Sequence, residues 1–175
     1  FALMGNHEYN AICFHYQESE GGHLRKHLIK NIVQHYETLK QFHNRQDEYE
    51  DYIDWFKTLP LFYETDNFRA VHACWYQDDI DFLKQVLIND KLSDSIIYQS
   101  VKKGTRLHNA VEDVLKGKEL QLPDGVYFHD KENNKRCEIR IKWWEDVNNS
   151  NYRNVSVEPL DHLPEDQIDL SDTGY

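Results

Sequence analysis

Apolar residues recur every three or four positions over residues 23–42, and this periodicity is the strongest constraint on the fold. The spacing places these residues on one face of a long helix, because an α-helix completes a turn in about 3.6 residues. A second helix is expected to follow and to end at Leu59-Pro60, since proline cannot donate a backbone hydrogen bond. Together they predict a helical hairpin over about residues 23–58. The apolar positions are Leu24, Leu28, Ile32, His35, Leu39 and Phe42 in the first helix, and Tyr49, Tyr52, Ile53 and Phe56 in the second.

Short apolar segments bounded by turn-forming residues predict strands around this hairpin. Residues 1–4 lead into Gly5 and indicate a buried strand that stops at a tight turn. Residues 61–64 and 68–73 flank Thr65-Asp66-Asn67, which are residue types that favour tight turns. Further helices are expected at about 78–88, 93–101 and 105–115, and further strands at 126–129 and 137–144. The sequence therefore predicts a mixed α/β (α+β) chain with helices over about 78–116.

The charge of the chain restricts its partners. It has 175 residues with 31 Asp and Glu against 20 Lys and Arg, a formal net charge of −11. Phosphate groups of nucleic acids and anionic lipid headgroups repel such a chain, so neither a nucleic-acid duplex nor a membrane is expected as a partner. Divalent metal ions suit an acidic chain better.

The acidity is concentrated near the C-terminal end. Residues 144–175 hold eight acidic residues and one basic residue, whereas residues 1–143 hold 23 acidic and 19 basic residues. We therefore expect the body of the domain at residues 1–145 and an acidic loop or tail at residues 146–175.

Cysteine usage and hydropathy indicate a cytoplasmic protein. Cys13, Cys74 and Cys137 are an odd number at long spacings, which suits reduced thiols better than a disulfide framework. No apolar run reaches the roughly 18 residues that a membrane span requires.

Gly5-Asn6-His7-Glu8 is the first candidate site, directly after the expected strand at residues 1–4. Glycine allows a sharp turn, an asparagine oxygen can bind a divalent ion, and a neighbouring histidine can hold or donate a proton. Glu8 is a candidate for a supporting role, in which it would orient His7 without binding the metal ion itself. The structural alternative is a capped turn between a strand and a helix.

His72 is the second candidate, near the end of the strand expected at residues 68–73. Strand ends line the site crevice in layered α/β folds, so a histidine there is well placed to bind a metal ion. The structural alternative is a core histidine with its hydrogen bonds satisfied.

At these segments the sequence resembles the calcineurin-like metallophosphoesterases. Met4-Gly5-Asn6-His7-Glu8-Tyr9-Asn10-Ala11 is similar to the Gly-Asn-His-Glu block of that family, and Val71-His72-Ala73 is similar to its later histidine block. The likeness is closest to bacterial members related to the serine/threonine phosphoprotein phosphatases and the diadenosine tetraphosphatases. The resemblance implies a four-layer α/β/β/α sandwich, here partial and with a large helical insertion.

The resemblance also implies a mechanism and roles for particular residues. Two divalent ions would activate a hydroxide that attacks phosphorus in a phosphate ester or a nucleotide polyphosphate. Asn6 and His72 would bind one ion, and His7 would protonate the leaving oxygen or stabilise its charge. An amide oxygen and an imidazole suit Mn, Fe, Ni or Zn.

Other blocks of that family are absent from the sequence. Neither Asp-x-His nor Gly-Asp-x-x-Asp-Arg-Gly occurs, and no late Gly-His pair follows Trp144. We therefore expect an internal fragment of a hydrolase, inactive by itself because two ligands cannot hold a two-metal centre. His72-Ala73-Cys74 replaces the His-Gly-Gly of the phosphoprotein phosphatases, which argues against a phosphoprotein substrate. The alternative from a different class is a non-enzymatic, acidic helical domain that binds or regulates a partner.

Overall fold

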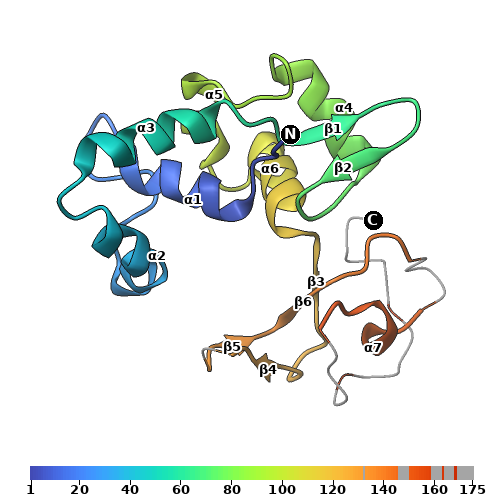
Figure 1. The fold of residues 1–175 in the computed structure, drawn as a ribbon. Coiled ribbons are helices and arrows are strands. Elements are labelled where there is room, and N and C mark those ends of the chain that lie inside the picture. Colours follow the sequence, from blue (N-terminus) through green and yellow to red (C-terminus); the bar gives the residue numbers. More distant parts are fainter. Residues whose placement is uncertain (132, 146–149, 159–162, 164–167, 169–175) are drawn as a thin grey trace. The chain divides into compact units, whose positions relative to one another are not determined.

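The computed structural model describes residues 1–131, 133–145, 150–158, 163 and 168 (Figure 1). The chain divides into two compact units, residues 1–116 and residues 117–175. This boundary precedes the division expected at residue 145, because residues 119–121 pair with residues 138–140 and hold them in the second unit.

The first unit contains six helices in its described residues. They are α1 (Asn6–His15), α2 (Ile29–Gln41), α3 (Gln46–Lys57), α4 (Gln77–Val86), α5 (Asp94–Ser100) and α6 (Arg106–Lys116). The helices expected at 78–88, 93–101 and 105–115 are confirmed within two residues. The helix expected from residue 23 begins only at Ile29, because Gln17 and His23 form a β-bridge and residues 24–28 are non-helical.

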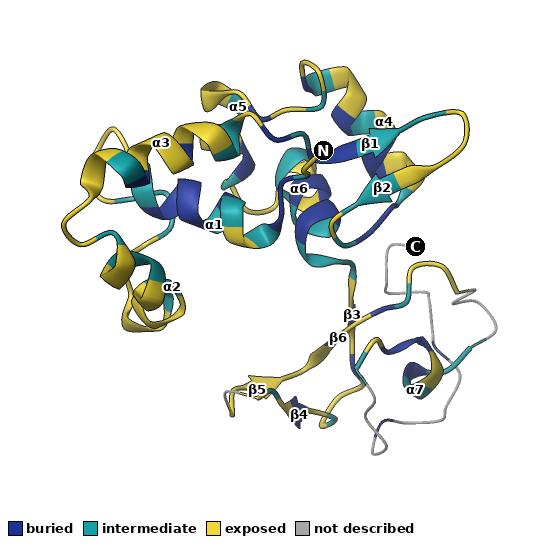
Figure 2. Cartoon of the chain, in the orientation of Figure 1, coloured by how far each residue is buried: buried dark blue, intermediate teal, exposed yellow. Residues whose placement is uncertain are grey.

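The core of the first unit forms between α1, α3, α4, α5 and α6 (Figure 2). Helix α3 lies along α1, and α4 lies against α6 (Figure 1). Each fully buried aliphatic side chain stabilises the unit by about 1.5–3 kcal/mol. Its side chains of zero exposure include Met4, Ile12, Leu61, Ile80, Leu83, Ile97, Val111, Val114 and Leu115. Helix α2 differs from these helices, because none of its residues is buried.

The hairpin expected around residues 65–67 is confirmed. Strands β1 (Phe62–Glu64) and β2 (Arg69–Val71) pair antiparallel, with Phe62 opposite Val71. The backbone amide of Phe68 donates to Thr65 Oγ1 at 3.1 Å, which closes the turn. The strand expected at residues 1–4 is wrong: these residues are not in a strand, and the amide of Met4 donates to the carbonyl of Pro60 at 2.9 Å.

The second unit is built from short strands. Its elements are β3 (Glu119–Gln121), β4 (Phe128–His129), β5 (Lys135–Arg136), β6 (Glu138–Arg140) and α7 (Tyr152–Val155). Pairing joins β4 with β5 and β3 with β6. The strand expected at 137–144 is shorter than expected, because β6 covers only residues 138–140 and Ile141 forms an isolated bridge with Ser156. A small core includes Leu120, Ile139, Ile141, Tyr152, Val155, Leu163 and Ile168. The expected acidic tail therefore contributes buried residues here, while residues 146–149, 159–162, 164–167 and 169–175 lie outside the described residues.

The mixed α+β class is confirmed, but the sandwich is not. In the described residues each of the three sheets has two antiparallel strands, and no larger sheet joins them. The four-layer α/β/β/α architecture implied by the resemblance therefore stays a prediction. No helix among the described residues has both the length and the hydropathy to cross a membrane.

Candidate functional site

The two candidate segments meet at one end of the β1–β2 hairpin. The amide of Met4 bonds to the carbonyl of Pro60, two residues before β1 begins. Phe62, at the start of β1, lies opposite Val71 at the end of β2. The chain that follows Met4 and the chain that follows Val71 therefore come to the same place, although 66 residues lie between Gly5 and His72.

Gly5 and His72 lie in direct proximity. A Cβ atom on Gly5 would lie 2.9 Å from Cε1 and 3.0 Å from Nδ1 of the His72 imidazole. Gly5 has φ of −104°, an ordinary value for any residue. Space, and not backbone conformation, is therefore the reason that a glycine suits this position.

Glu8 belongs to the same arrangement. Its Oε2 accepts a hydrogen bond from the amide of Gly5 at 3.0 Å and lies 2.6 Å from the position of a Gly5 Cβ. A carboxylate there is favourable, because the first turn of α1 leaves amide groups without helical partners and carries the positive end of the helix dipole. The Glu8 carboxylate and the His72 imidazole therefore both lie close to the position that a Gly5 Cβ would occupy.

Asn6 and His7 are the first two residues of α1. Asn6 is half-buried and His7 is exposed, as is His72. The structure thus brings Gly5, Glu8 and His72 together and places Asn6 one residue from this group. His7 also acts on α2: burial lowers the pKa of His35, and the charges of Arg25, His27 and His7 lower it further.

Buried contacts fix the segments that carry these residues. Ser100 Oγ donates to the carbonyl of Ile97 at 2.8 Å, so it accepts the hydrogen bond from the Tyr9 hydroxyl at 2.8 Å. Burial raises the pKa of the Tyr9 hydroxyl. The amide of Ala73 donates to the carbonyl of Val114 at 3.1 Å, which anchors the residue after His72 to α6. The helix start and the histidine are therefore held from opposite sides.

The donor types present fit a divalent ion only in part. In the described ranges of the chain, no group of three or more His, Cys, Asp or Glu side chains could hold a metal ion. The amide oxygen of Asn6 and the imidazole of His72 are suitable donors, but they are two in number. Known protein families, curated proteins and solved structures give no match to this chain.

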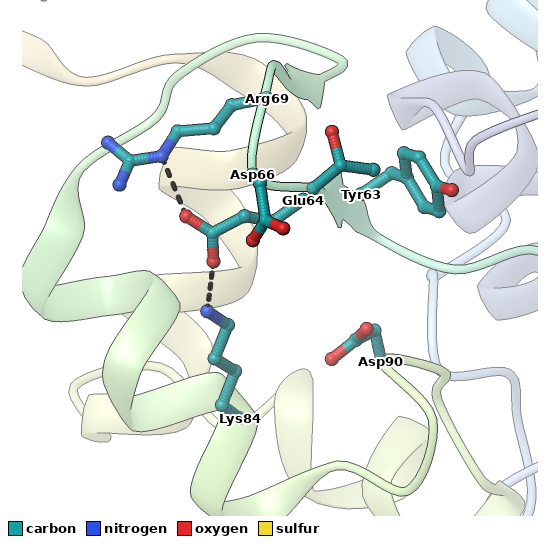
Figure 3. A pocket seen from close by; sticks show the side chains of 7 residues that line it. Tyr63, Glu64, Asp66, Arg69, Lys84 and Asp90 are labelled. Carbon is teal, nitrogen blue, oxygen red and sulfur yellow. Dashed lines mark hydrogen bonds and ion pairs between the residues drawn. The ribbon is translucent and has the colours of Figure 1, made fainter.

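A polar pocket that the sequence did not suggest lies beside the β1–β2 hairpin (Figure 3). Its volume is about 540 Å³. Glu64 is at its centre, accepting a hydrogen bond from Arg69 Nε at 2.7 Å and forming an ion pair with Lys84. The lining residues are Tyr63, Glu64, Thr65, Asp66, Arg69, Lys84 and Asp90.

The electrostatics of this pocket do not favour an anionic ligand. The hydrogen bonds from Lys84 and Arg69 lower the pKa of Glu64, so its carboxylate stays ionised and pairs with both cations. Asp66 and Asp90 add further negative charge. No motif joins these residues, because they come from a hairpin, a helix and a loop spread over residues 63–90.

Histidines to which the sequence assigned no role form an aromatic cluster with α1. The ring of His27 stacks on Phe14 and on His23, with ring centroids 3.8 Å apart in both pairs. His27 Nε2 donates to the carbonyl of Phe14 at 2.9 Å, since a carbonyl can only accept. His35 Nε2 lies 2.9 Å from the Tyr49 hydroxyl. These contacts attach residues 23–35 to α1 and α3.

Proposed function

We propose that this chain supplies one side of a dinuclear metallophosphoesterase centre that hydrolyses a phosphate ester or a nucleotide polyphosphate. The observation that carries the proposal is the proximity of Gly5 and His72, which come from the two segments similar to that family. If these two segments lay apart in the structure, their residues could not contribute to one site.

Each residue has a distinct part in the proposal. Asn6 and His72 hold one ion, and His7 protonates the leaving oxygen from its exposed position on the first turn of α1. Glu8 fixes the turn through its hydrogen bond to the amide of Gly5. When bound, two divalent ions supply the nucleophile and neutralise charge on the phosphoryl group.

The proposal assigns the remaining ligands to sequence outside these residues. The described residues hold no three-ligand group, so we expect the 175-residue chain to bind an ion weakly and to turn over no substrate. Cys13 and Cys74 are buried and are not in disulfides, which supports a cytoplasmic setting for the enzyme.

Manganese titration of the 175-residue chain tests the ligand assignment. Paramagnetic Mn²⁺ should broaden the NMR signals of Asn6 and His72 before those of other residues, and His72→Ala should abolish this selectivity. His43→Ala, which removes an exposed histidine elsewhere in the first unit, is the matched control. Uniform broadening, or broadening confined to acidic surface residues, would favour the alternative of a non-enzymatic acidic helical domain.

Turnover of a chromogenic phosphate diester with Mn²⁺ tests the activity. The complete gene product should hydrolyse it, Asn6→Ala and His72→Ala should abolish hydrolysis, and His7→Ala should reduce it by about 10²–10⁴-fold. Hydrolysis by the 175-residue chain alone would contradict the assignment of further ligands to flanking sequence.

A further inference from the structure

An exposed apolar stripe runs along α2. Ile29, Ile32, Val33 and Tyr36 are spaced so that they share one face of the helix. Ile29 is 82% exposed and Val33 is 67% exposed. Figure 2 shows this helix exposed over most of its length, in contrast to the buried faces of α1 and α6.

Residues on the side of α2 next to Ile32 attach the helix to the first unit. His35 bonds to Tyr49 of α3 and packs against Phe14 of α1. Leu39 and Phe42 are half-buried on the same side. The attachment therefore uses His35, Leu39 and Phe42 and leaves Ile29, Val33 and Tyr36 exposed.

A contiguous apolar stripe is unusual on a protein surface that contacts only solvent. Amphipathic helices normally turn their aliphatic face toward a core, and contiguous exposed apolar side chains mark interaction sites. The exposed stripe is therefore a candidate for contact with another molecule.

Charges beside the stripe indicate which molecule. Lys30 and Glu37 are seven residues apart, so they lie two turns apart on the same flank of the stripe. Among the described residues Lys30 has no ion-pair partner, and the Glu37 carboxylate, 72% exposed, lies only within 3.8 Å of Lys40. The flank thus carries an available positive charge at one end and a weakly paired negative charge at the other.

We propose that two copies of this chain associate through α2, packed antiparallel about a two-fold axis. In this arrangement Ile29 lies against the partner's Tyr36, and Ile32 lies against the partner's Val33. Lys30 comes beside the partner's Glu37, and the symmetry forms this ion pair twice. A parallel two-fold arrangement would put the two flanks that carry Lys30 and Glu37 on opposite sides of the interface and would form no such pair.

The size of the stripe predicts a weak association. A standard interface buries about 800 Å² on each partner, and one short helix face offers less. The dimer should therefore form with rising concentration, over a range from about 1 µM to about 1 mM.

Sedimentation velocity of the full chain over this range tests the proposal. We expect a shift from monomer to dimer, and Val33→Glu should keep the chain monomeric with an unchanged far-ultraviolet circular dichroism spectrum. Gln85→Glu introduces the same charge at an exposed position of α4 and should leave the dimer intact.

Charge reversal tests the antiparallel arrangement. Lys30→Glu and Glu37→Lys should each weaken the dimer by about 3–10-fold, because each breaks two symmetric rim pairs. The double reversal restores opposite charges and should return the affinity to that of the original chain. Single reversals without effect, or a double reversal that stays weak, would overturn the arrangement.

Two further outcomes would overturn the proposal as a whole. One is a monomer at every concentration, which would mean that no second copy covers the stripe. The other is a dimer that survives Val33→Glu, which would place the interface on another surface, such as the face of α3 where Tyr52 and Trp55 are exposed.

Discussion

The buried carboxylate of Asp79, at the start of α4, forms an ion pair with Arg106 at the start of α6. The Asp79 side chain is 1% exposed and that of Arg106 is 48% exposed, so only the Asp79 side chain of this pair is buried. The second oxygen of Asp79, Oδ2, has no hydrogen-bond partner in the described part of the chain.

This asymmetry makes the two deletions unequal. Arg106→Ala should lower the free energy of unfolding by about 3 kcal/mol, because it leaves a buried carboxylate without its counter-ion. Asp79→Asn should cost only about 1–2 kcal/mol, because the guanidinium can turn to water. Urea unfolding measures both.

The double variant and a control complete this test. Arg106→Ala with Asp79→Asn should be more stable than Arg106→Ala alone, since no charge is then buried. Lys103→Ala, which removes an exposed cation three residues earlier, should change stability by less than about 0.5 kcal/mol. Equal costs for Arg106→Ala and Asp79→Asn would contradict the account.

The proximity of Gly5 and His72 gives a second prediction. Gly5→Ala should destabilise the chain by about 1 kcal/mol, because the new methyl group must displace the imidazole and the Glu8 carboxylate. Alanine also restricts the unfolded chain, so the substitution is best read in a double-mutant cycle. In a His72→Ala background the cost should fall, and an identical cost in both backgrounds would show that the two residues do not meet.

The lowered pKa of His35 predicts a loss of stability in acid. Burial is the main cause, followed by the positive charges of Arg25, His27 and His7. The folded state therefore binds a proton less readily than the unfolded state, whose histidine has the ordinary value of 6.5. The stability from this group is complete above pH 6.5 and is lost as the pH falls through the lowered folded-state value.

Thermal unfolding at several pH values measures this effect. The loss of Tm between pH 7.5 and pH 5 should be smaller in His35→Gln, which cannot titrate, than in the original chain. His43→Gln, at an exposed position beyond α2, should keep the original pH dependence. An undiminished loss in His35→Gln would assign the acid sensitivity to other groups.

The hydrogen bond from Tyr9 to Ser100 predicts a smaller change. Tyr9→Phe should cost about 1 kcal/mol, because it removes a buried hydroxyl donor while the Ser100 hydroxyl keeps its bond to Ile97. Tyr98→Phe removes an exposed hydroxyl that donates to the carbonyl of Gln17, and it should cost less. Chemical denaturation of the two variants compares them, and equal losses would argue against a special role for the buried bond.

Local sequence signals predicted local elements well. Apolar periodicity located α3 to α6 within a few residues, and Thr65-Asp66-Asn67 marked the β1–β2 turn through its side-chain chemistry. Periodicity defines an apolar face but not what covers it. Ile32 was expected in a core and is 37% exposed. The attachment of α2 depends on Phe14 and Tyr49, which are far from α2 in sequence, so the periodicity of α2 could not show which of its residues are covered.

The candidate site could be anticipated only in outline. Two similar patterns, each an apolar segment followed by a ligand-type residue, suggested that Asn6 and His72 would share a site. The structure brings Gly5, the residue before Asn6, against His72. The strand expected before Gly5 did not form, since a single bond from Met4 to Pro60 positions that segment. The hydrogen bond from the Gly5 amide to Glu8 depends on side-chain geometry that sequence spacing does not specify.

The long sequence separation of these contacts has a consequence for the order of folding during synthesis. Gly5-Asn6-His7-Glu8 leaves the ribosome among the first residues of this segment. The hydrogen bond from Met4 can form only after Pro60 has been synthesised, and the hydrogen bond from Tyr9 only after Ser100 has been synthesised. The last anchor, the carbonyl of Val114 that holds Ala73, is made later still. A nascent chain that ends before Val114 therefore lacks a positioned His72, and stalled or truncated products would expose α1 without its partners.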